Sequence, residues 1–130
     1  MEIKDSKGDV VAIFQCFNEF SDSKSFLTNS KNEFQFGTFN LKTGEVIDRH
    51  VHHHQSREIK NTSEGIVVLE GRIKINFFDT EKHYLTTLEM KEKDSILILK
   101  GGHELFILES AKFVEFKQGP YINQLDKERF

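Results

Sequence analysis

Four of the six histidines in this 130-residue chain lie within five positions, in the run His50-Val51-His52-His53-His54. In an extended strand, side chains two residues apart point to the same face, so His50, His52 and His54 would share one face and His53 would lie on the other. Neutral imidazole is the commonest protein ligand for metals and suits zinc, copper, iron and nickel. The run therefore indicates either a metal site or a row of solvated surface histidines.

Strands must position these histidines, because the rest of the chain alternates short apolar runs with turns. We expect a turn at residues 42–45, with Gly44 at a positive φ, and then a strand from Val46 through His54. About nine short strands without a helical period predict an all-β sandwich or barrel. The other expected strands cover residues 9–17, 34–41, 65–69, 73–77, 83–89, 95–99, 104–109 and 111–117, with a loop at 20–32.

Length and composition restrict the class of protein. A chain of this length is expected to form one domain, and a net charge of -3 with interspersed signs argues against nucleic acid or an anionic membrane as a partner. No apolar run is long enough for a membrane span, and the charged first residues do not resemble a signal peptide. A single cysteine, Cys16, agrees with a reducing compartment, so we expect a cytoplasmic protein.

Two further residues could complete a metal site with the histidines. Glu64 stands at the start of the apolar run 65–69, and His103 follows the Gly101-Gly102 turn after the apolar run 95–99. One carboxylate and two or three imidazoles from neighbouring strands form an open site for a divalent transition metal. The plainer alternatives are a strand-start carboxylate at Glu64 and a turn residue at His103.

These residues resemble the two motifs of the cupin superfamily. Gly44, the histidine pair, Glu64 and Gly71 are similar to the first motif, and Asp94 followed by a strand, two glycines and His103 is similar to the second. The resemblance implies a single-domain cupin-type jelly-roll β-barrel, or double-stranded β-helix. It implies a motif core at residues 44–117, an N-terminal strand and loop at 1–33 and a tail at 118–130.

The resemblance also implies a divalent metal, zinc, iron, nickel or manganese, held inside the barrel by His50, His52, His54, Glu64 and His103 as candidate ligands. The segment between the histidines and Glu64 is longer than is usual in the family, and the proline of the second motif is absent. His52 is a ligand on either alignment. The second histidine of the pair is either His50, which has the better spacing from Gly44, or His54, which lies closer to Glu64.

The function implied is a metal-binding cupin whose pocket takes a small, sugar-related molecule. The segment 115–121 and the turn before His103 resemble uncharacterised small cupins associated with polysaccharide biosynthesis. A catalytic member would be a metal-dependent isomerase or dioxygenase, but no catalytic residue can be named. The alternatives are a non-catalytic ligand-binding or regulatory module and a metal-free sugar isomerase or epimerase. A homodimer is expected, formed through the strand at residues 10–17.

Overall fold

The computed structural model describes residues 1–21, 23–120, 122 and 126–130 as an all-β protein with antiparallel sheets. A single 3-10 turn, η1 (Phe17–Glu19), is the helical element among these residues. None of the helical structure described has the length and apolarity needed to cross a membrane. The strands are β1 (Glu2–Lys4), β2 (Val10–Gln15), β3 (Ser23–Phe26), β4 (Gly37–Asn40), β5 (Glu64–Phe78), β6 (Tyr84–Lys91), β7 (Ser95–Ile98) and β8 (Gly102–Lys117).

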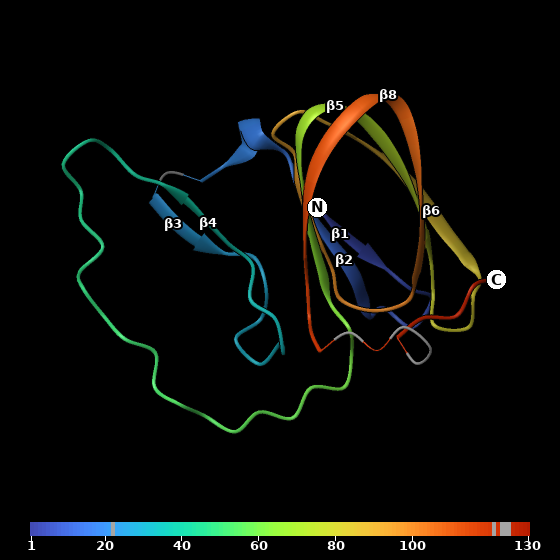
Figure 1. The fold of residues 1–130 in the computed structure, drawn as a ribbon, viewed down its shortest axis with the longest axis horizontal. Helices are drawn as coiled ribbons and strands as arrows, with labels where there is room; N and C mark the ends of the chain where they lie inside the picture. The colour runs from blue at the N-terminus through green and yellow to red at the C-terminus, as the bar shows by residue number, and fades with distance from the viewer. Residues whose placement is uncertain (22, 121, 123–125) are drawn as a thin grey trace.

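Six of these strands form the main sheet, which we call the body. Its order is β1-β2-β7-β5-β6, and β8 pairs with β5 along nearly its whole length. The paired β5 and β8 arch over together, as Figure 1 shows. The strands are antiparallel, so the first residues of β5 and of β8 lie at opposite ends of the ladder. The arch brings these two ends close together.

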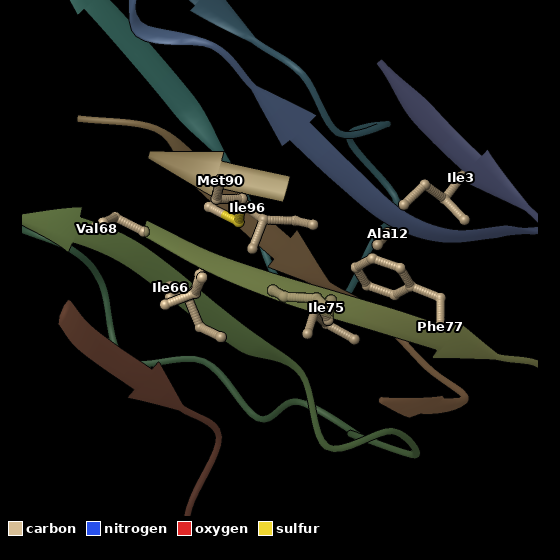
Figure 2. Packing of buried hydrophobic residues seen from close by; sticks show 10 residues of the cluster. Ile3, Ala12, Ile66, Val68, Ile75, Phe77, Met90 and Ile96 are labelled. Carbon is tan, nitrogen blue, oxygen red and sulfur yellow. The ribbon is translucent and has the colours of Figure 1, made fainter. Parts of the chain in front are cut away.

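The core lies on the inner side of this arch. Alternate residues of β5 point inward and are fully buried, as expected for a strand with one face in a core. The side chains pack against β2, β6 and β7 (Figure 2). The cluster consists of Ile3, Ala12, Ile66, Val68, Ile73, Ile75, Phe77, Met90, Ile96 and Ile98.

The sequence predicts two pairs of short strands where the structure has two long ones. The expected turn around Gly71 is instead a bend within β5, where the register with β8 shifts several times between Val68 and Ile73. Gly71 has a φ of +81°, and β8 runs unbroken past Ser110. Bulges let a strand bend without ending, so the glycine marks a bend rather than a turn.

Of the other predicted strands, three are confirmed and one is shorter than expected. The strands at 9–17, 83–89 and 95–99 are confirmed as β2, β6 and β7. Part of the expected loop at 20–32 is strand β3, and the strand expected at 34–41 begins only at Gly37. Gly44 has the expected positive φ, of +91°.

The strand predicted from Val46 through His54 is wrong. Residues 41–63 have no strand, and the histidine run is exposed throughout. Alternation alone does not hold an extended segment in place, because a strand needs a neighbour to accept its backbone hydrogen bonds. The segment at 10–17 was also expected at the edge of the sheet, but β2 lies between β1 and β7.

We call residues 20–62 the arm. It leaves the body after η1 and carries β3 and β4, which form a separate two-stranded sheet. Figure 1 shows that the arm extends away from the body and returns at the start of β5.

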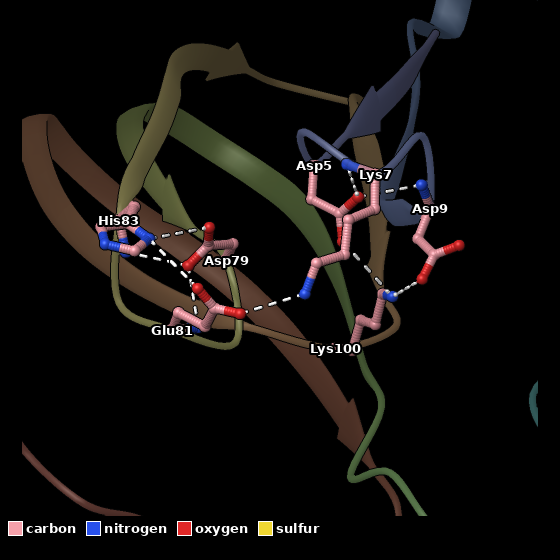
Figure 3. A network of polar contacts seen from close by, with 7 residues as sticks. All are labelled: Asp5, Lys7, Asp9, Asp79, Glu81, His83 and Lys100. Carbon is pink, nitrogen blue, oxygen red and sulfur yellow. Dashed lines mark hydrogen bonds and ion pairs between the residues drawn. The ribbon is translucent and has the colours of Figure 1, made fainter.

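Two turns at one end of the body are built on aspartates. Asp5 Oδ1 accepts the backbone N–H groups of Lys7 and Asp9, at 3.0 and 2.9 Å. Asp79 Oδ1 does the same for Glu81 and His83, at 2.8 and 2.9 Å. Lys7 then bridges the two turns through Glu81 at 3.0 Å, as Figure 3 shows.

Candidate functional site

Glu64 opens β5 in the middle of the main sheet. Its backbone lies between β7 and β8, with Ile98 and Lys117 as its direct neighbours. The side chain follows the same alternation as buried Ile66 and Val68, and it is 12% exposed. The local sequence explains this position, because the apolar run after Glu64 fixes which face of the strand points inward.

His103 lies at the opposite end of the arch. It is the second residue of β8 and lies opposite Phe77, which is fully buried. Because directly paired residues share a face of a sheet, His103 points to the same inner side as Phe77. The arch then brings His103 Nε2 to 3.0 Å from Glu64 Oε2.

Lys117 completes the cluster from the last position of β8. Its Nζ lies 3.0 Å from Glu64 Oε1 and 3.4 Å from Glu115 Oε1. Each oxygen of Glu64 therefore has its own partner, an imidazole on one side and an ammonium on the other. Lys117 is not among the residues predicted from the sequence, because a lysine that ends a strand is usually solvated. Lys117 points inward because it pairs directly with Glu64 of β5, and the pairing of these two strands is not visible in the local sequence.

These contacts determine the charge of Glu64. The hydrogen bond from His103, and after it the hydrogen bond from Lys117, lower the pKa of Glu64 to about 2, although burial of the carboxyl opposes the shift. The contact with Glu64 in turn raises the pKa of Lys117. Glu64 is therefore a carboxylate at any physiological pH.

The four histidines of the arm lie apart from this cluster. His50 Nδ1 is 2.8 Å from the backbone oxygen of Asp48, and its ring meets that of His52 edge-on, with 5.2 Å between centroids. The structure thus brings together Glu64 and His103 of the predicted ligands and leaves His50, His52 and His54 exposed. The choice between His50 and His54 stays open.

A divalent metal fits the described cluster only in part. Carboxylate and imidazole are suitable donors for zinc or another first-row ion, and Glu64 is already ionised. Such an ion needs three or more protein donors, and within the described ranges no group of three His, Cys, Asp or Glu side chains is close enough to hold one. The cluster therefore supplies two metal donors, and any further donors must come from residues outside it.

His83, the remaining histidine, lies at the surface. Its Nδ1 is 3.3 Å from Asp79 Oδ2, within the turn that Asp79 organises. Tyr121, in the closing segment 115–121, lies outside the described residues, as do four other positions, 22 and 123–125.

Comparison of the chain with protein-family models, with curated proteins and with solved structures finds no match.

Proposed function

We propose that this protein is a metal-binding cupin that holds a divalent transition metal at Glu64 and His103 and completes the site with histidines of the arm. The observation that carries the proposal is the 3.0 Å contact between Glu64 and His103, residues 39 positions apart that come from opposite ends of the arch. The sequence alone predicts both residues as ligands. The arched body is also consistent with the jelly-roll barrel that the cupin resemblance implies.

The residues have distinct parts in this proposal. Glu64 supplies a permanently charged carboxylate, and His103 an imidazole whose Nε2 faces that carboxylate. Lys117 balances the charge of Glu64 when the metal is absent. A bound ion would polarise an oxygen atom of a small ligand, such as a sugar hydroxyl or a carboxylate. The same arrangement serves an enzyme or a ligand-binding module, and turnover assays with a panel of sugars and small acids separate the two.

Metal analysis of protein purified without a histidine tag tests the proposal. We expect close to one equivalent of transition metal per chain, and loss of most of it in Glu64→Gln and in His52→Ala. His53→Ala is the matched control, because on an extended segment His53 points away from His52, and this variant should retain the metal.

Less than about a tenth of an equivalent in the wild type, with none regained on soaking with zinc or iron, would overturn the proposal. Equal loss from His52→Ala and His53→Ala would contradict the assumed alternation of the histidines.

A further inference from the structure

β8 has a long edge that no described strand covers. Within the part of the chain that the structure describes, β8 pairs with β5 alone. Its outward-facing residues at both ends are apolar and partly exposed, with Phe116 at 58% and Phe106 at 39%. Natural sheets protect such edges with charges, prolines or another segment of chain, because an open apolar edge recruits additional strands. Among the described residues, therefore, no strand pairs with this edge of β8.

The arm contains an alternating segment that has no partner strand among the described residues. Its segment at 46–54 forms no strand, although its alternation is typical of one. Val46, Ile47 and Val51 are 79%, 58% and 80% exposed. The hairpin of β3 and β4 also exposes Phe26 and Phe39, and an isolated two-stranded hairpin is only marginally stable in water.

The arm is nevertheless held together as a unit. Glu33 Oε2 accepts the backbone N–H groups of Lys60 and Asn61, each at 3.1 Å, and so joins the outgoing and returning limbs. Leu27 and Asn29, between β3 and β4, line a cleft together with Val10 of the body, so this part of the arm lies beside β2. β7 and β5 separate β2 from β8 in the sheet. Residues 46–54 nevertheless stay exposed and form no strand, so this segment does not cover the edge of β8 in its own chain.

The site lies next to that same edge. His103 and Lys117 stand at the two ends of β8, and both contact Glu64. A strand added along β8 would place alternate side chains on the inner side of the sheet, beside His103. His50, His52 and His54 have that alternation.

We propose that the arm of one copy docks along β8 of a second copy, in a reciprocal exchange that covers both edges and delivers the arm histidines to the partner's Glu64 and His103. The metal part of this inference rests on the proposed function. Exchange of identical elements is a low-cost route to a symmetric dimer, since each contact is made twice. The dimer would be the state that binds metal, and neither chain would hold a complete site alone.

A mixing experiment tests whether the site is shared. His52→Ala lacks a ligand on the arm, and Glu64→Gln lacks one on the body, so each variant alone should bind little zinc. Unfolding the two together and refolding them should restore about a quarter of wild-type zinc binding, because half the dimers are mixed and each has one intact site. Zinc restored to less than a few percent, with the wild type fully loaded, would overturn the exchange and leave the metal site within one chain.

A second measurement does not depend on metal. In metal-free buffer, sedimentation should give a dimeric mass for the wild type and a monomeric mass for Val51→Pro, because proline removes a backbone donor and disfavours strand pairing. Glu58→Pro is the matched control, placed in the same arm outside the histidine run, and should remain dimeric. A monomeric wild type, or a dimer that Val51→Pro leaves intact, would overturn the exchange. A dimer that depends on Val51 but binds no metal would contradict the proposed function alone.

Discussion

At the scale of single residues, Glu64 combines a negative charge with a largely buried position. It is nearly buried, carries a charge, and has one partner for each oxygen. Removing one member of a buried charged cluster costs more than the cluster contributes as a whole, because the remaining charges lose their compensation. The cluster is therefore expected to affect stability as well as ligand binding.

Glu64→Gln should lower the free energy of unfolding by about 1–2 kcal/mol in metal-free buffer, since Lys117 and His103 lose a charged acceptor. Denaturant titration at neutral pH measures this. Glu115→Gln is the control, because Glu115 is 40% exposed and contacts the same lysine at 3.4 Å. It should cost less than about 0.5 kcal/mol. Similar losses in the two variants would show that the buried position of Glu64 adds nothing.

At the scale of elements, the paired β5 and β8 carry the architecture of the site. Their bend replaces two predicted turns, and it depends on close approach of the two backbones at Gly71. A Cβ on Gly71 would lie 2.1 Å from the carbonyl oxygen of Ser110, a distance that atoms do not tolerate. Without the bend, Glu64 and His103 would stand at opposite ends of a straight ladder.

Gly71→Ala should therefore destabilise the protein by at least about 3 kcal/mol, through both the clash and the positive φ. Gly44→Ala is the matched comparison, since Gly44 also has a positive φ but a Cβ there meets nothing within 4 Å. Its cost should be about 1 kcal/mol. Thermal or denaturant unfolding of both variants measures the difference, and equal effects would mean that the contact with Ser110 relaxes freely.

At the scale of the whole molecule, the polar network in Figure 3 ties together parts of the chain that are far apart in sequence. Lys100, after β7, pairs with Asp9 at 2.7 Å, while Lys7 reaches Glu81 between β5 and β6. Exposed ion pairs contribute little individually. Asp5 and Asp79 matter more, because the side chain of each accepts backbone hydrogen bonds that hold a turn closed.

Acid titration of stability should reveal this contribution at Asp79. Backbone N–H groups of His83 and Glu81, with the His83 side chain, hold the pKa of Asp79 below its ordinary value of 3.8. Lys7 and Glu81 are the other charged groups nearby. A depressed pKa stabilises the folded state above the ordinary value, and this stabilisation is lost as pH falls through the lower folded pKa.

Asp79→Asn should thus be less stable than the wild type at neutral pH, and the difference should shrink as the pH falls below the ordinary value of 3.8. Denaturant midpoints across this range measure it. Asp48→Asn, in the arm, should follow the wild-type curve, because Asp48 contacts His50 through its backbone oxygen. A difference that stays constant with pH would contradict an ionised Asp79 as the cause.

The sequence by itself determined the all-β class, most of the body strands, the turn at Gly44, and the prediction of Glu64 and His103 as candidate ligands. These follow from local properties, since alternation, β-branched residues and glycines act over a few neighbouring positions. Only the tertiary structure showed that β5 and β8 are long and bent, that Lys117 joins the pair, and that the histidine segment is unpaired within one chain. Those features depend on which strands meet, and strand pairing joins residues far apart in the chain, which a local pattern does not encode.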